Sequence, residues 1–159
     1  MILVIGATGF IGTNVVRELV ERGESVRIFR RTSSNMLGLE NLPFEEYFGD
    51  LLNPEAVRRA MKGCTRVFHL AAVVSLRPYE TRHLSDIHIK GTNIVAQTAL
   101  EEGVERFVYT SSGVTVGYNP GSKPATEANG VSLTHLGLPY VETKIKAEEL
   151  VLQFFHKGL

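Results

Sequence analysis

Short apolar runs alternate with longer amphipathic segments along the chain. Residues 2–5 are uniformly apolar, as expected of a strand that is buried on both faces of a parallel sheet. The next segment, residues 11–21, carries Ile11, Val15 and Leu19 at the spacing that forms one apolar stripe on a helix. The chain therefore opens with a predicted strand followed by a predicted helix.

The same alternation continues to the last residues. Further strands are expected over residues 25–29, 44–48, 67–70 and 106–110, further helices over 54–62, 84–102 and 140–156, and a loop over 117–138 that is rich in Gly, Pro, Ser, Thr and Asn. Strands that alternate with helices imply right-handed crossovers. The sequence therefore predicts an α/β fold, a Rossmann-type doubly wound parallel sheet between two helical layers, in which residues 1–159 form a single domain.

Composition limits the classes of partner. The chain has 17 basic and 17 acidic residues and a formal net charge of zero, so no overall field attracts nucleic acid or an anionic membrane. No stretch approaches the roughly 20 apolar residues of a membrane helix, and the five scattered histidines form no metal-ligand pattern. A single cysteine, Cys64, fits a reducing compartment. We expect a cytoplasmic protein that binds neither nucleic acid nor metal.

Three glycines mark the junction between the first strand and the first helix. Gly6, Gly9 and Gly12 are spaced three residues apart within the motif GATGFIG. In a dinucleotide-binding turn the first glycine permits the sharp turn, the second lets the backbone approach the pyrophosphate, and the third lets the helix pack on the strand. The strand before and the helix after are the context that this function requires. The candidate cofactor-binding residues of the motif are Gly6, Thr8, Gly9, Phe10, Ile11 and Gly12.

The end of the second predicted strand bears on which dinucleotide binds. An NAD enzyme usually places an acidic residue there, to hold a ribose hydroxyl, whereas this chain has Arg30 and Arg31. Guanidinium groups suit a 2′-phosphate because they offer paired, permanently charged donors. We therefore expect NADP as the cofactor and NAD as the second choice. The alternative is that both arginines are solvated surface residues.

Several further motifs occur in a fixed order along the whole chain. They are GDL at 49–51, VFHLAA at 67–72, KGTNIV at 90–95, FVYTSS at 107–112 and YVETK at 140–144. Together with the glycine turn, whose spacing is the pattern of short-chain dehydrogenases, they resemble the extended short-chain dehydrogenase/reductase family, also called the NAD-dependent epimerase/dehydratase family. Within it the chain is most similar to the dihydroflavonol-4-reductase-like group and to the related hopanoid-associated sugar epimerase-like proteins.

This resemblance implies roles for residues outside the glycine turn. Asp50 would accept a hydrogen bond from the adenine amino group, with Leu51 against the ring, although Asp50 can also be read as a turn residue. Ala71 and Ala72 would let the cofactor lie close to the backbone. The family usually carries asparagine at the position of His88, where it supports the water network of the catalytic lysine. Members are about twice this length, so we expect an N-terminal part that lacks the C-terminal substrate region, and long helices that pair in a homodimer.

The resemblance also implies a catalytic set of Ser112, Tyr140 and Lys144. Tyr140 and Lys144 would also contact the cofactor, Lys144 through the nicotinamide ribose hydroxyls. Tyr140 and Lys144 are four residues apart, which places them on one helix face. A nearby ammonium lowers the pKa of a tyrosine from about 10, so that Tyr140 can exchange a proton with a carbonyl or an alcohol. Ser112 ends a predicted strand, where it would bond the substrate oxygen, and Ser111 is the neighbouring alternative.

The function that follows is an NADP(H)-dependent carbonyl reductase or alcohol dehydrogenase acting on a small molecule. A nucleotide-sugar epimerase or dehydratase would use the same residues with a transient keto intermediate. A non-catalytic NAD(P)-binding domain is the third possibility, favoured by His88 and by the absent second half.

Overall fold

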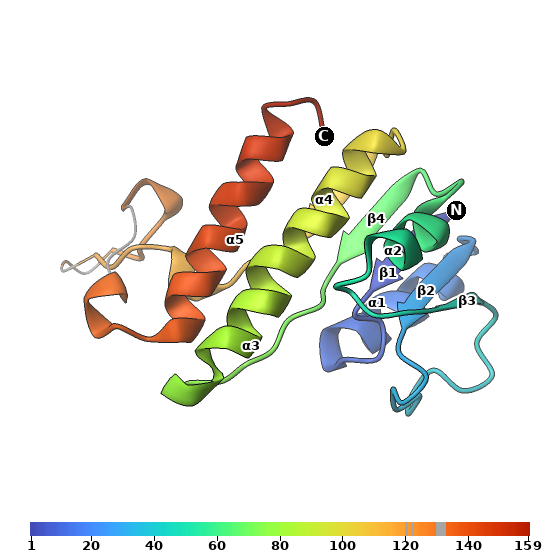
Figure 1. Cartoon of the computed structure of the whole chain (residues 1–159), viewed down its shortest axis with the longest axis horizontal. Coiled ribbons are helices and arrows are strands. Elements are labelled where there is room, and N and C mark those ends of the chain that lie inside the picture. The colour runs from blue at the N-terminus through green and yellow to red at the C-terminus, as the bar shows by residue number, and fades with distance from the viewer. Residues whose placement is uncertain (120, 122, 130–132) are drawn as a thin grey trace.

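The structure is a computed structural model that describes residues 1–119, 121, 123–129 and 133–159. It contains a five-stranded parallel sheet. The strand order is β3-β2-β1-β4-β5 (Figure 1). The strands are β1 (Ile2–Ile5), β2 (Val26–Arg30), β3 (Glu45–Phe48), β4 (Arg66–His69) and β5 (Arg106–Tyr109). The order reverses between β1 and β4, as in a doubly wound sheet. The predicted Rossmann-type α/β fold is confirmed.

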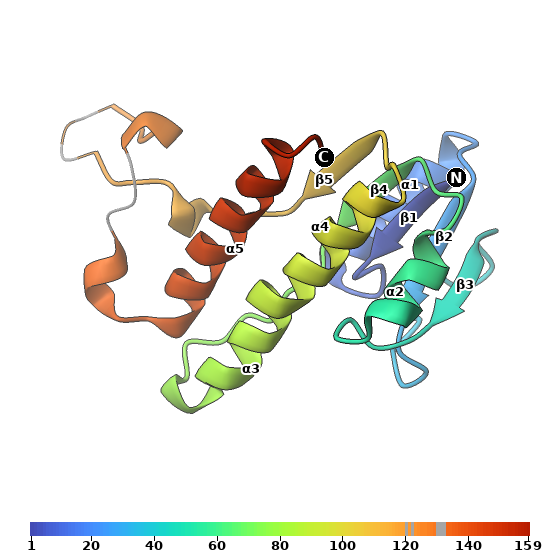
Figure 2. The ribbon, with the colours of Figure 1, turned by 45° about the horizontal axis from the view of Figure 1, so that its top comes forward.

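Helices cover both faces of this sheet. The α-helices are α1 (Phe10–Glu21), α2 (Pro54–Met61), α3 (Thr81–Ser85), α4 (Thr92–Glu101) and α5 (Pro139–Phe155). Helix α1 lies on one face, whereas α2, α4 and α5 lie on the other (Figures 1 and 2). None of the helices in the described ranges combines the length and the apolar content that crossing a bilayer requires. The loop expected over 117–138 includes residues 120, 122 and 130–132, which lie outside the described residues.

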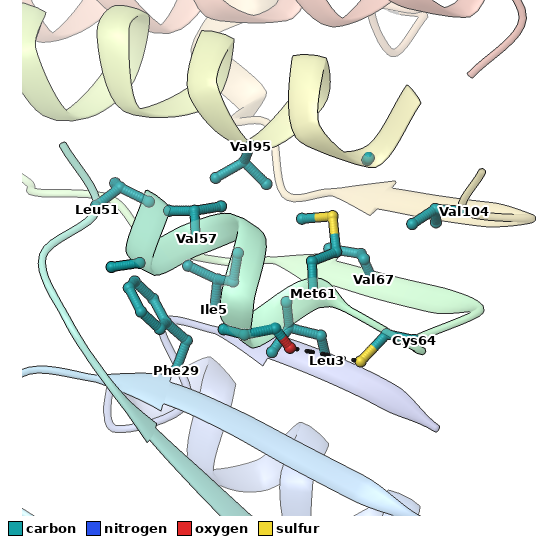
Figure 3. Packing of buried hydrophobic residues seen from close by; sticks show 13 residues of the cluster. Leu3, Ile5, Phe29, Leu51, Val57, Met61, Cys64, Val67, Val95 and Val104 are labelled. Carbon is teal, nitrogen blue, oxygen red and sulfur yellow. Dashed lines mark hydrogen bonds between the residues drawn. The ribbon is translucent and has the colours of Figure 1, made fainter. Parts of the chain in front are cut away.

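Strand β1 supplies side chains to both cores, one on each face of the sheet. Leu3 and Ile5 pack toward α2 and α4 (Figure 3), whereas Ile2 and Val4 pack toward α1. All four are at most 2% exposed, and burying each such side chain stabilises the fold by about 2 kcal/mol. This double burial is the reason why β1 is apolar at every position.

Strand β3 lies at the edge of the sheet, and its glutamates pair with arginines of β2. Arg27 contacts Glu45 at 2.8 Å and Arg30 contacts Glu46 at 2.6 Å. The parallel register of the two strands brings these side chains together across the sheet. Charges on an edge strand also discourage pairing with another chain. The two glutamates are therefore compatible with the strand predicted there.

The helix expected over 84–102 consists of three segments. Helix α3 is followed by a π-helical turn, η2 (Asp86–Gly91), and then by α4. Such wide turns interrupt the regular ladder and often occur at functional sites. Here the turn contains His88, which bonds two other segments of the chain. Gly91 at its end packs so closely that an added Cβ would lie 2.5 Å from Leu51 Cδ2. The long helical stretch predicted over 84–102 is confirmed, and the π-helical turn inside it is a feature that the sequence pattern did not predict.

Candidate active site

The glycine turn after β1 is closed by backbone contacts that exclude side chains. Gly6 has a φ of +90°, and an added Cβ would lie 2.6 Å from Ala71 N. At Gly12 an added Cβ would lie 2.1 Å from Gly6 O. These positions fit the sharp turn and the close helix packing expected from the sequence. At Gly9, by contrast, the nearest atom would be Gly6 O at 3.5 Å, so the turn leaves its outer side open.

A cavity of about 300 Å³ opens where the carboxyl ends of β1, β2 and β4 meet. This edge is where doubly wound sheets bind their ligands. The cavity collects most of the predicted cofactor residues from four separate stretches of sequence. Those in its wall are Gly6, Thr8, Gly9, Arg30, Arg31, Asp50, Leu51, Ala71 and Ala72, together with Ile5, Phe29, Ser34, Gly49, Leu70, Val73, His83 and Ile87.

The remaining three candidate residues of the glycine motif, Phe10, Ile11 and Gly12, lie outside this wall. Phe10 is 89% exposed and Ile11 is 53% exposed, and both side chains line a separate open groove with Phe68. Gly12 is buried beneath the turn. The structure therefore does not bring the side chains of Phe10 and Ile11 to the cavity. Only the backbone of this first helical turn is suited to face an anion.

The two arginines at the end of β2 differ in their surroundings. Arg30 donates from Nε to Glu46 Oε2 at 2.6 Å, and its guanidinium stacks 4.5 Å from the centre of the Phe48 ring. Its charge is therefore already paired. Arg31 is exposed at the cavity wall beside Ser34. Of the two, Arg31 is the better placed to meet a phosphate.

Asp50 occupies the turn between β3 and α2. Its Oδ1 accepts a hydrogen bond from Leu52 N at 2.8 Å, so it has the turn role that the sequence left open. The same residue is exposed in the cavity wall, and the neighbouring Leu51 is buried against Gly91. The turn therefore presents one carboxylate and one apolar side chain to the cavity.

Lys144 is buried on α5, one helical turn after Tyr140. The side chain is 2% exposed, and its Nζ donates to Tyr109 Oη and to Thr110 O, both at 2.8 Å. Burial lowers the lysine pKa to about 8, because a charged amine loses hydration there. Thr110 directly follows β5, so these bonds fix the predicted catalytic helix to the end of that strand.

The two adjacent serines after β5 have different partners. Ser111 Oγ donates a hydrogen bond to Glu148 Oε2, a residue of α5 that sequence reasoning missed. Ser112 instead caps the 3-10 turn η3 (Gly113–Thr115), where its Oγ accepts from Val114 N at 3.4 Å. The hydroxyl hydrogen of Ser112 thus remains available to a substrate. The spacing of four residues from Lys144 to Glu148 was the signal that could have identified the glutamate.

His88 joins the cavity wall to α5, the helix that carries Tyr140 and Lys144. Its Nε2 accepts from Val73 N at 3.1 Å, and its Nδ1 lies 2.9 Å from Thr143 Oγ1. The Thr143 hydroxyl donates to Pro139 O at 2.7 Å, so Nδ1 carries the proton and the ring is neutral. Burial, with the nearby Lys144 charge, lowers the pKa of His88 to about 4.

The ring contacts of His88 also reach Tyr140. The two rings meet edge to face, with 5.7 Å between their centres. With both nitrogens engaged, His88 holds the backbone of Val73 and the helix turn of Thr143, and does not bond Lys144 itself. Within the described residues, His, Cys, Asp and Glu side chains form no group of three that could hold a metal ion.

Comparison with known proteins places this geometry among oxidoreductases and epimerases. The sequence profile of the 3-beta hydroxysteroid dehydrogenase/isomerase family matches residues 3–156. Sterol demethylase protein B of Methylococcus capsulatus is 40% identical, over 99% of this chain and 48% of its own length. A protein of Synechocystis sp., provisionally named as a dihydroflavonol 4-reductase, is 36% identical over 98% of this chain and 45% of its own length.

The solved structures include a UDP-glucose 4-epimerase from Thermus thermophilus in complex with NAD. It is 26% identical, with a TM-score of 0.83, over 98% of this chain and 51% of that chain. The chain thus spans about half the length of the relatives that it matches. The resemblance to the extended short-chain dehydrogenase/reductase family, including its dihydroflavonol-4-reductase-like members, is confirmed.

Proposed function

Because the chain belongs to the 3-beta hydroxysteroid dehydrogenase/isomerase family, we propose that it is the dinucleotide-binding domain of an NADP(H)-dependent carbonyl reductase or alcohol dehydrogenase. Its substrate is a small molecule with a carbonyl or hydroxyl group, of the kind that dihydroflavonol reductases and sterol dehydrogenases use. The name of the Synechocystis relative and that of the matching family support this class of reaction.

The cavity after β1 fits a dinucleotide. Its floor is a turn that has no room for a Cβ at Gly6, while Gly9 leaves the outer side open. Backbone N–H groups of the first turn of α1 would hold the pyrophosphate. Asp50 and Leu51 would hold the adenine, and Arg31 would hold a 2′-phosphate. The nicotinamide, when bound, supplies or accepts the hydride.

The residues of α5 and the turn after β5 supply the acid–base chemistry. Tyr140 gives a proton to the carbonyl oxygen during reduction and takes it back during oxidation. Lys144, with a pKa of about 8, is mostly charged at pH 7 and lies one helical turn from Tyr140. With a cofactor bound, Lys144 would hold the ribose hydroxyls, and the Ser112 hydroxyl would orient the substrate oxygen.

One observation carries this proposal. His88 bonds Val73 in the wall of the cavity and Thr143, which lies between Tyr140 and Lys144 on α5. His88 therefore links the cavity wall to the helix that carries Tyr140 and Lys144, which supports the assignment of both to one site.

The test separates cofactor binding from turnover. In the full-length active enzyme, Tyr140→Phe should bind NADPH as the parent does, measured by fluorescence titration, and lose at least about 100-fold in turnover of a dihydroflavonol or a 3-ketosteroid. Tyr79→Phe is the control, because Tyr79 is 76% exposed. Equal turnover in Tyr140→Phe and the parent would refute the catalytic assignment.

An epimerase is the second candidate, favoured by the likeness to the NAD-bound UDP-glucose 4-epimerase. An epimerase regenerates its cofactor in each cycle, whereas a reductase consumes NADPH in proportion to product. Net NADPH oxidation with a carbonyl substrate therefore favours the reductase. Interconversion of UDP-sugars without net oxidation favours the epimerase.

A further inference from the structure

Glu148 lies against the turn that carries the candidate catalytic serine. It follows Lys144 by one turn of α5 and is only partly exposed. Its Oε2 accepts the hydroxyl of Ser111 and lies 2.9 Å from Thr115 Oγ1. A single carboxylate of the catalytic helix therefore contacts the hydroxyls on both sides of Ser112.

These contacts determine which serine is left for a substrate. The Ser111 hydroxyl is engaged by Glu148, and Thr115 Oγ1 also lies 2.8 Å from Ser112 O. The backbone of Ser112 is thus held between two anchored neighbours. Its own hydroxyl accepts only the long 3.4 Å contact from Val114 N. Loss of the carboxylate would release Ser111 and loosen the geometry at Ser112.

Glu148 is also the acidic side chain that acts on Lys144. Burial lowers the lysine pKa, and the charge of Glu148 opposes that change. The titratable groups that face Lys144 or its partner Tyr109 come from four elements: His69 of β4, His88 of η2, Tyr109 of β5, and Tyr140 and Glu148 of α5. Burial lowers the pKa of His69 to about 3 and that of His88 to about 4, so both are neutral at pH 7. The negative charge of Glu148 therefore faces the ammonium without a competing histidine cation.

We propose that Glu148 is a positioning residue of this site, which holds the turn of residues 111–115 against α5 so that Ser112 meets the substrate. The proposal rests on the proposed oxidoreductase function for its catalytic meaning. Its structural part, the contact of Glu148 with Ser111 and Thr115 and its charge one helical turn from Lys144, holds independently of turnover. Glu148 acts through Ser112 and Lys144 and has no contact of its own with the reacting atoms.

The first experiment measures Lys144 directly on this chain. The 15Nζ resonance of Lys144 is titrated in Glu148→Gln, which keeps the shape of the side chain, and in Glu149→Gln, an exposed neighbour on the same helix. The pKa of Lys144 should fall by about 1 unit in Glu148→Gln and stay within about 0.2 units in Glu149→Gln. An equal Lys144 pKa in the two variants would overturn the coupling.

The second experiment separates charge from position in the full-length active enzyme. Glu148→Gln should move the alkaline limb of kcat/KM to lower pH, because the lost negative charge makes Lys144 deprotonate sooner. Ser111→Ala keeps the carboxylate, so it should lower kcat/KM about tenfold and leave that limb in place. If Glu148→Gln does not fold, Thr115→Val tests the positioning role instead. Like Ser111→Ala, it should lower kcat/KM about tenfold and leave the alkaline limb in place.

The two proposals fail in different ways. If the parent enzyme reduces no carbonyl substrate but the Lys144 titration shifts as expected, the proposed function is wrong and the coupling of Glu148 stands. If the parent is active while Glu148→Gln and Ser111→Ala match Glu149→Gln in both rate and pH profile, the positioning role is refuted.

Discussion

Two buried histidines make the stability of this protein depend on acid. His69 is 0% exposed and His88 is 1% exposed. Burial, with the charge of Lys144 nearby, lowers the pKa of His69 to about 3 and that of His88 to about 4, against 6.5 for a free histidine. The fold therefore keeps both rings neutral. Below pH 6.5 the unfolded chain takes up two protons that the folded chain does not.

The size of the effect follows from these values. The stabilisation that neutral histidines give is fully present above pH 6.5 and is lost as the pH falls toward the folded pKa values. At pH 5 the linkage relation gives a loss of about 2 kcal/mol for each histidine, or about 4 kcal/mol for the pair. A domain of this size is stable by roughly 5–15 kcal/mol, so the loss is a large share of the total.

Urea unfolding, followed by circular dichroism at pH 7 and pH 5, measures this loss. The carboxyl groups of Glu24 and Asp86, whose pKa values are lowered by hydrogen bonds to Arg66 and Lys90, contribute mainly below pH 5. Between pH 7 and pH 5, the free energy of unfolding of the double variant His69→Asn/His88→Asn should fall by about 4 kcal/mol less than that of the parent. The free energy of unfolding of the exposed control His156→Asn should fall by as much as that of the parent. An equal loss in the parent and the double variant would refute the reasoning.

Two further predictions concern the glycine turn and the cofactor. Gly12→Ala should destabilise the fold by about 3 kcal/mol in the same urea assay, since its Cβ would lie 2.1 Å from Gly6 O. Gly113→Ala, whose Cβ would meet no atom within 4 Å, should change stability by less than about 0.5 kcal/mol. Arg31→Ala should weaken NADPH about tenfold relative to NADH in fluorescence titrations, and Arg59→Ala should leave that ratio unchanged. An unchanged ratio in Arg31→Ala would mean that Arg31 does not bind the 2′-phosphate.

The fold was predictable because local patterns and crossover rules agree. The apolar run of β1 reflects burial on both faces of the sheet, and the glycines at 6 and 12 reflect contacts that leave no room for a Cβ. The π-helical turn η2 was not predictable from periodicity, since its cause is a set of contacts with distant segments. Sequence periodicity describes one element at a time and carries no information on such contacts.

The same distinction applies to the candidate site. The spacing from Tyr140 to Lys144 lies within one helix, so the sequence placed both on α5. The partners of Ser111 and His88 come from residues 37 and 55 positions away, and no spacing rule reaches that far. The ion pair of Arg30 with Glu46 on β3 is a further contact between distant segments that the sequence alone did not reveal.

The π-helical turn has a physical explanation in the polar residues that it buries. Leu84, His88 and Thr92 are spaced by four residues, and all three are at most 1% exposed. In an α-helix of 3.6 residues per turn, one step of four residues stays on the same face, but the two steps from Leu84 to Thr92 drift by about 80° around the helix axis. A wider turn between them reduces this drift. Buried polar groups require hydrogen-bond partners: His88 bonds Val73 and Thr143, and Thr92 bonds His69 at 3.0 Å. The wide turn thus directs Thr92 toward β4 and His88 toward α5, the helix that carries Lys144.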